Sequence, residues 1–431
     1  MHVYPAPLKK ISQDLRRGTV DLEQYIVNIC DHIEKVEPDV QALLPEPGRK
    51  ERLLKEAAAL KDRYPEPAGR PVLYGIPVGV KDLLRVDGFP TRAGSSLDPA
   101  LFQGPEAACV KLLRQAGALV LGKTVTTEFA YFEPGPTRNP HNLNHTPGGS
   151  SSGSAAAVAA GMCPLALGTQ TMGSVTRPAA FCGIVGFKPS YDRISTAGLV
   201  YFSPSVDHLG LFTQDLAGTE IAAAVFCRDW HPVDTAPGKP VLGVPEGPYL
   251  EKAGTEARQV FEQQLDRLSG AGIDIIRLPV LEDVEALARR HNRMASAEIA
   301  AMHAPWFSRY EELYRPRTVQ IIREGQEIPD EEIEKARRGR SKLRRRLENC
   351  MQEAGIDLWA APSTRGPAPE GISATGDPAM NLPWTYAGLP TITLPTGKAD
   401  NGLPLGLQLI APFWADEKLL AWTRELSCHL G

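Results

Sequence analysis

The stretch TPGGSSSGSAAA at positions 146–157 is the densest feature of the sequence and decides the interpretation of its fold. Its glycines and serines open an alanine-rich helix, where small side chains leave main-chain N–H groups without helical partners accessible. The stretch lacks the Gly-Lys-Ser/Thr ending of a P-loop and the GxGxxG order of a dinucleotide fold, so nucleotide binding is the weaker functional interpretation. A tight turn capped by serines is the structural alternative.

A second cluster, GTQTMGSVTRP at positions 168–178, follows one predicted helix and one predicted strand later. A helix of about nine residues after Ser152 advances about 13 Å, and a returning strand of about five residues covers a similar distance. The second cluster therefore returns close to the first. We expect Ser150 and Ser174 to face each other.

A base is needed beside these serines, because a serine hydroxyl is a poor nucleophile until a neighbour accepts its proton. His141 and His145 precede the first cluster, but neither has an obvious acidic partner to orient it. Lys81 ends the run VLYGIPVGV at 72–80, which is typical of a buried strand. Burial there would lower the pKa of the Lys81 amine and make the neutral form available as a base.

Several motifs together resemble the amidase signature family. They are GVKD at 79–82, GGSSSGS at 148–154, the 24-residue step to Ser174, FCGIVGFKP at 181–189, SVDHLG at 205–210, GLP at 388–390 and GLPLGLQ at 402–408. The resemblance covers nearly the whole chain and is loose only over 281–355. It implies a single amidase domain over residues 1–431, with an α/β fold whose mixed, mostly parallel central sheet is covered by helices on both faces.

The resemblance also implies the roles of individual residues. It gives a catalytic triad of Ser174 as nucleophile, Ser150 as bridging serine and Lys81 as base, with a cis peptide bond before Ser150. It implies substrate contacts at Gly149 and Arg177 and no cofactor or metal. The family's oxyanion hole falls on the main-chain N–H groups of Thr171, Met172, Gly173 and Ser174.

Three positions depart from the commonest family pattern. Gln170 stands where aspartate is usual, and Met172 where glycine is usual. Either the main chain at Met172 needs no positive φ, or the site loses about 1 kcal/mol there; the side chain would also narrow the acyl pocket. Arg177 lies three residues after the nucleophile rather than two, a pattern similar to malonamidase-type enzymes, in which the arginine holds a substrate carboxylate. The alternative is that Arg177 pairs with a structural carboxylate such as Asp207 or anchors a main-chain carbonyl.

Texture along the chain agrees with one α/β unit. Residues 9–64 predict two or three amphipathic helices, and strand-like and helix-like segments then alternate. Residues 281–355 are charged and helical, and we interpret them as an insertion that lines the substrate entrance. The basic run at 337–346 has acidic neighbours, so it predicts a solvated helix face.

Composition sets limits on the remaining function classes. The formal net charge of −4 argues against nucleic acid as the main ligand. The N-terminus has no visible secretory signal and no segment makes a good bilayer span, so we expect a cytoplasmic protein without a membrane partner. Seven scattered cysteines predict reduced thiols, and nine histidines show no metal-binding spacing. A homodimer is compatible with the sequence.

Three functional hypotheses follow. The first is an amidase that hydrolyses the C–N bond of a small carboxamide, with or without a carboxylate, through an acyl-enzyme. The second is the ammonia-generating glutaminase subunit of a tRNA-dependent amidotransferase, against which Gln170 and Met172 count. The third is a non-catalytic scaffold of the same fold, which would be expected to have lost one of the three triad residues. Structural roles are predicted for Asp82, Cys182, Asp207 and Asn381.

Overall fold

The computed structural model describes residues 1–233, 236 and 238–430. Its strands are β1 (Pro77–Lys81), β2 (Leu119–Thr124), β3 (Leu165–Gln170), β4 (Val185–Lys188), β5 (His208–Thr213), β6 (Leu242–Glu246), β7 (Ile275–Pro279), β8 (Leu358–Pro362), β9 (Thr391–Lys398) and β10 (Pro404–Ile410). Its longer helices are α1 (Leu8–Arg17), α2 (Leu22–Val40), α3 (Arg49–Arg63), α4 (Ala108–Gln115), α5 (Ser152–Ala159), α7 (Leu216–Phe226), α8 (Thr255–Gly270), α9 (Val284–Tyr310), α10 (Pro316–Gln326), α11 (Asp330–Ala354) and α13 (Asp416–Ser427). Two short helices, α6 (Thr176–Phe181) and α12 (Leu382–Ala387), lie near the clusters described above.

One ten-stranded sheet runs through the molecule in the order β2-β1-β3-β5-β4-β9-β10-β8-β6-β7. The α/β fold with a mixed sheet is confirmed. The balance of directions differs from the expected one: pairs at the two ends are parallel, whereas every pair from β3 to β8 is antiparallel. The parallel pairs belong to units in which a helix crosses back over the sheet, as α4 does between β1 and β2 and α5 does between β2 and β3.

Helix α5 is buried on every side, and its small residues explain why. A Cβ atom at Gly153 would lie 2.2 Å from the carbonyl oxygen of Ala42 and 2.4 Å from the nitrogen of Val125. Only glycine lets the helix approach these main-chain atoms so closely. The Gly/Ser cluster is therefore held inside the protein, with the loop before α5 fixed against the sheet.

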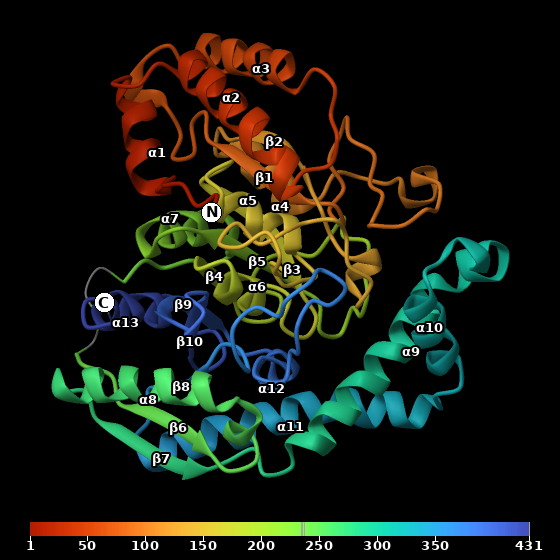
Figure 1. The fold of residues 1–431 in the computed structure, drawn as a ribbon, viewed down its shortest axis with the longest axis vertical. Helices are drawn as coiled ribbons and strands as arrows, with labels where there is room; N and C mark the ends of the chain where they lie inside the picture. Colours follow the sequence, from red (N-terminus) through yellow and green to blue (C-terminus); the bar gives the residue numbers. More distant parts are fainter. Residues whose placement is uncertain (234–235, 237, 431) are drawn as a thin grey trace.

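The outer helices are arranged around this core as Figure 1 shows. The N-terminal helices α1, α2 and α3 lie together at one end, and β6, β7 and α8 lie at the other. The segment 281–355 forms α9, α10 and α11, which run along one side of the molecule. Among the described residues, no helix combines the length and apolar character needed to cross a membrane.

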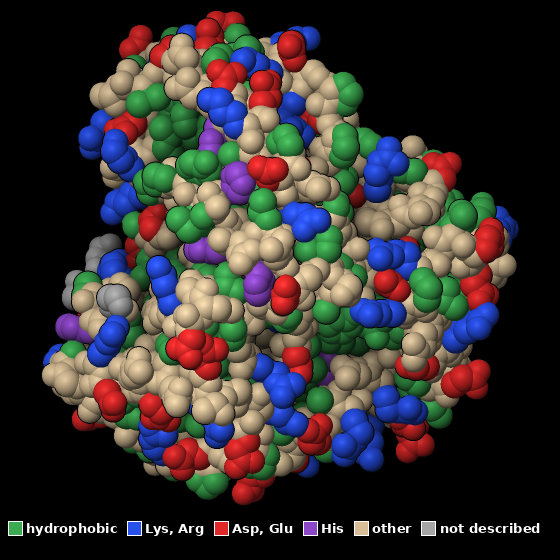
Figure 2. Space-filling model, viewed as in Figure 1, with side chains coloured by type: hydrophobic (Ala, Val, Ile, Leu, Met, Phe, Trp, Pro, Cys, Tyr) green, Lys and Arg blue, Asp and Glu red, His purple; other side chains and the backbone are tan. Residues whose placement is uncertain are grey.

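The basic run of α11 is neutralised by acidic partners. Arg337 pairs with Glu298 of α9, and Arg346 pairs with Asp283 just before α9. Basic and acidic side chains are interspersed over the face drawn in Figure 2. The run therefore forms the solvated, ion-paired helix face predicted from the sequence.

Candidate active site

The sheet itself brings the two sequence clusters together. β1 and β3 are parallel neighbours, so their carboxyl ends meet at the same edge of the sheet. Lys81 is the last residue of β1, and Thr169 lies at the end of β3. Ser150 precedes α5, and Ser174 lies in the loop between β3 and α6, so all four residues gather at this edge.

Lys81 is fully buried and has two hydroxyl partners. Its Nζ donates to Ser150 Oγ at 2.7 Å and to Thr169 Oγ1 at 2.6 Å. Burial holds the pKa of Lys81 well below its ordinary value, and the carboxylate of Asp207 opposes this only in part. The amine is thus in the environment that favours its neutral form, as the apolar run before it predicted.

Ser150 and Ser174 line the same pocket, which also contains Thr171, Met172 and Arg177. The peptide bond between Gly149 and Ser150 is cis. The Ser174 hydroxyl makes no hydrogen bond to any residue that the structure describes, so it remains available to a ligand. Gly149 does not line this pocket, and its contact with substrate stays a prediction.

The loop 171–174 presents a row of main-chain donors. Within the described part of the chain, none of the N–H groups of Thr171, Met172, Gly173 and Ser174 has a protein acceptor. Such a row is what stabilises the oxyanion in acyl transfer. Met172 has no positive φ, so methionine causes no main-chain strain at this position.

Gln170 shapes this loop from below. Its Oε1 accepts from the main-chain nitrogens of Val175 at 2.7 Å and Thr176 at 3.0 Å. Its Nε2 donates to Thr385 Oγ1 at 2.9 Å, and that hydroxyl donates in turn to Met172 O at 2.6 Å. An amide performs both tasks because it is donor and acceptor at once, which gives the departure from aspartate a structural reason.

Gly173 and Asn381 are in close contact behind the loop. A Cβ atom at Gly173 would lie 2.5 Å from Asn381 Oδ1. Asn381 is itself fixed, since its Nδ2 donates to Ser363 O at 2.8 Å. Asn381 therefore supports the loop, in agreement with the structural role expected for it, and glycine is required at 173.

Arg177 is buried and only partly satisfied. Its Nη2 donates to Gly149 O at 2.7 Å and to Thr375 Oγ1 at 3.3 Å. Nε and Nη1 are buried and have no partner among the described residues. Burial lowers the pKa of Arg177 to about 10, with Asp377 opposing the shift, so the side chain remains a cation at neutral pH. The expected main-chain anchor is present, and two donors are left over beside Ser174.

Asp207 has the structural role expected of it, but not as a partner of Arg177. It accepts from Thr171 Oγ1 at 2.5 Å and from the nitrogens of Phe202 and Ser203, both at 2.9 Å. Burial raises the pKa of Asp207 to about 6. Asp207 thus connects the loop 202–207 to the row of main-chain donors.

A carboxylate from the helical segment holds the same loop from outside. Glu298 of α9 accepts from Ser203 Oγ at 2.6 Å and Ser205 N at 3.0 Å, and it pairs with Arg337 at 2.7 Å. Burial alone would raise the pKa of Glu298, but these hydrogen bonds bring it below its ordinary value. Helices α9 and α11 are therefore connected to Thr171 through the loop 202–207.

The alternative residues weighed from the sequence lie elsewhere. His141 Nε2 is 3.0 Å from Cys182 O, and His145 Nδ1 is 2.8 Å from Ala368 O, so both rings bind main-chain carbonyls. Neither histidine lines the pocket of Ser174. Asp82 pairs with Lys123 at 2.8 Å, and Cys182 is fully buried with its pKa raised by burial. Asp82 and Cys182 have the structural surroundings expected of them.

Several site residues escaped the sequence analysis. Thr169 was part of the second cluster but carried no signal of its own as a partner of Lys81. Thr375 lies 198 residues from Arg177 along the chain. The aromatic wall of the pocket, Tyr131, Phe132 and Phe202, also comes from outside the motifs.

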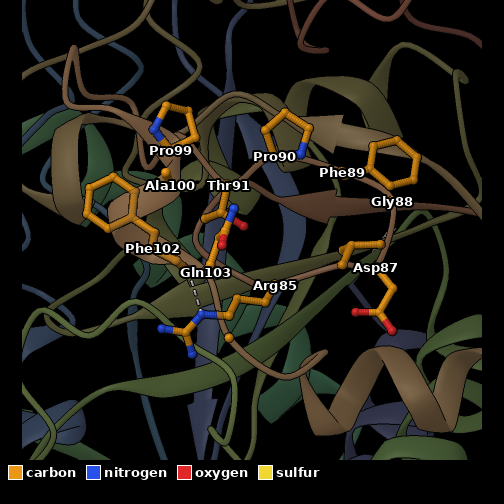
Figure 3. Close-up of a pocket in the computed structure, with 12 residues that line it drawn as sticks. Arg85, Asp87, Gly88, Phe89, Pro90, Thr91, Pro99, Ala100, Phe102 and Gln103 are labelled. Carbon is orange, nitrogen blue, oxygen red and sulfur yellow. Dashed lines mark hydrogen bonds between the residues drawn. The ribbon is translucent and has the colours of Figure 1, made fainter.

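A larger cavity lies between β1 and α4 (Figure 3), lined in part by Arg85, Asp87 and Thr91. Its volume is about 520 Å³. Arg85 Nε donates across it to Phe102 O at 2.7 Å. None of the residues lining this cavity is a serine, lysine, histidine or cysteine, so nucleophile and base meet only in the pocket of Ser174 among these two.

A family model described as Amidase matches residues 24–420. The chain belongs to the amidase family. One of the glutamyl-tRNA(Gln) amidotransferase subunits of Nitratidesulfovibrio vulgaris is 31% identical, with 97% of this chain and 96% of that protein covered. The resemblance inferred from the sequence motifs is thereby confirmed at the level of the family.

Solved structures agree with this assignment. One described as an amidase has a TM-score of 0.89 and 31% identity, covering 99% of this chain and 100% of that one. The peptide amidase of Stenotrophomonas maltophilia has a TM-score of 0.80 and 25% identity, covering 98% and 97%. The fold of this amidase family member is therefore shared along nearly its whole length.

Proposed function

We propose that this protein hydrolyses the C–N bond of a short amide that carries a carboxylate on its acyl side. The observation that carries the proposal is Arg177, whose unpartnered Nε and Nη1 share one pocket with Ser174. A buried guanidinium with free donors is costly unless an anion satisfies it. A substrate carboxylate supplies that anion and places the neighbouring carbonyl near Ser174.

The reaction proceeds through an acyl-enzyme. Ser174 Oγ attacks the amide carbonyl, its proton passes to Ser150 Oγ, and the proton of Ser150 passes to the lone pair of neutral Lys81. The 2.7 Å contact between Lys81 Nζ and Ser150 Oγ supports this relay. Ser174 and Ser150 are not hydrogen-bonded before substrate binds, and such contacts commonly tighten only in the complex.

The second half of the reaction reverses the relay. The main-chain N–H groups of Thr171–Ser174 stabilise the oxyanion, the C–N bond breaks, and the proton held by Lys81 returns through Ser150 to the departing amine. Water then attacks the acyl-enzyme, giving its proton to the same relay, and the free acid leaves Ser174. The mechanism requires only groups of this chain and water.

Ammonia release tests the proposal directly. Half-amides of malonic and succinic acid are compared with neutral primary amides of equal size, using the purified protein and its Ser174→Ala variant. We expect turnover of the half-amides, weak turnover of the neutral amides and none by Ser174→Ala. Equal activity towards neutral amides would remove the carboxylate from the proposal, and activity in Ser174→Ala would remove the nucleophile.

A second candidate is favoured by the curated relative described above. That protein belongs to a glutamyl-tRNA(Gln) amidotransferase and matches this chain over almost its full length. An ammonia-generating subunit would hydrolyse glutamine and would act together with partner chains. Glutaminase activity that appears only with a co-purified partner, together with inactivity on half-amides, would establish this candidate in place of the first.

A further inference from the structure

A second chamber opens from the pocket of Ser174. The two spaces share Tyr131, Phe132 and Met172 in their walls, so they meet at these side chains. The inner pocket has a free volume of about 10 Å³ and the outer chamber about 420 Å³. An inner space of this size fits about one water molecule, whereas the outer one is in the range of small-molecule sites.

The outer chamber is lined by one face of α9. Val284, Ala288, Asn292 and Ser296 follow each other at four-residue spacing, which places them in one row along a helix. Ile321 of α10 and Leu382 of α12 contribute to the same chamber. This lining belongs to the helical segment that the sequence analysis predicted at the substrate entrance.

The charged groups of the chamber are already engaged with one another. Lys252 pairs with Glu285, and Arg365 pairs with Asp377 at 2.6 Å. Glu324 accepts from the amide of Gln320 at 2.8 Å. Both cations of the lining are neutralised, so an anionic ligand finds no unpaired cation here. The remaining wall is apolar or carries uncharged polar groups.

We infer that the outer chamber binds the leaving amine, and that the substrates are N-substituted half-amides with an uncharged N-substituent of several non-hydrogen atoms. The inference rests on the proposed function, because it assigns the acyl group to the inner pocket of Ser174 and Arg177. An acyl group limited to a few atoms fits the small inner space. An ammonia leaving group would leave the chamber of α9 without a ligand.

The test compares three half-amides of succinic acid: the primary amide, the N-butyl amide and the N-carboxymethyl amide. In the wild-type protein we expect the highest kcat/KM for the N-butyl amide. Ala288→Trp or Asn292→Trp fills the chamber and should lower kcat/KM for the N-butyl amide by about tenfold or more, while changing the primary amide by less than about threefold. Ala301→Trp is the matched control, because Ala301 is an exposed residue of the same helix outside the chamber.

A primary amide that is hydrolysed as well as the N-butyl amide would overturn the inference, as would equal losses for both in the tryptophan variants. Thermal unfolding of each variant identifies a loss of folding. If no half-amide is turned over, binding of the N-butyl amide to Ser174→Ala is measured by calorimetry. Binding weakened by Ala288→Trp but not by Ala301→Trp would support the chamber while rejecting the proposed reaction. No binding, or binding insensitive to Ala288→Trp, would reject the chamber as well.

Discussion

Replacing Arg177 by leucine should separate substrates that carry a carboxylate from those that do not. The wild-type guanidinium offers Nε and Nη1 to the ligand while Nη2 stays bound to Gly149 O. Loss of a buried, charge-assisted pair costs about 2 to 5 kcal/mol, which corresponds to roughly 30- to 5,000-fold in rate at about 1.4 kcal/mol per factor of ten. We expect a loss of that size for a half-amide.

The matched substrate is the methyl ester of the same half-amide, which has the same length but no carboxylate. It should lose much less kcat/KM in Arg177→Leu. Arg177→Lys keeps a cation and should still fail to restore the rate, because an ammonium group cannot reproduce the planar fork. Removal of the anchor to Gly149 O costs about 1 to 3 kcal/mol of stability, which thermal unfolding detects. Equal losses for half-amide and ester in a folded variant would return Arg177 to a purely structural role.

Three further predictions follow from the surroundings of the pocket. First, kcat/KM should rise with pH through the depressed pKa of Lys81, because the amine acts as a base only when neutral; since the Asp207 carboxylate raises that pKa, Asp207→Asn should move the acid limb of the pH–rate profile to lower pH, and a limb that stays in place would contradict this link. Second, Glu298→Gln should lower kcat more than it changes KM and lower stability by about 1 to 3 kcal/mol, measured by steady-state kinetics and thermal unfolding; an unchanged kcat would show that the loop 202–207 does not depend on α9. Third, activity should survive chelators and thiol-alkylating reagents, as measured by ammonia release; inactivation by a chelator that added metal reverses would point to a different chemistry.

The motifs predicted the meeting of the two clusters because local geometry decides it. A short helix and a short strand bring the chain back over a distance that the rise per residue of each element fixes, and α5 and β3 have nearly the lengths assumed. The predicted strand at 72–80 begins later, at Pro77, because Gly75 adopts a positive φ of 72° and turns the chain first. Local sequence signals thus located the cluster but not every boundary.

Features that depend on distant segments were beyond the sequence. The directions of β5, β9 and β10 follow from long connections, so the antiparallel centre of the sheet could not be read from the motifs. The contact of Thr375 with Arg177 and the contact of Glu298 with Ser203 join residues far apart along the chain. Nothing in the local pattern around Thr375 or Glu298 distinguishes it from an ordinary surface threonine or helix glutamate.

The central claim is that Ser174 is the nucleophile activated through Ser150 and Lys81. The most direct measurement is peptide mass spectrometry after treatment with a fluorophosphonate, compared for the wild-type protein, Ser174→Ala and Lys81→Ala. We expect a single adduct on the peptide that contains Ser174, none in Ser174→Ala, and labelling slowed by several orders of magnitude in Lys81→Ala, together with loss of turnover in both variants. An adduct on another serine that abolishes activity, or turnover that persists in Ser174→Ala, would contradict the account.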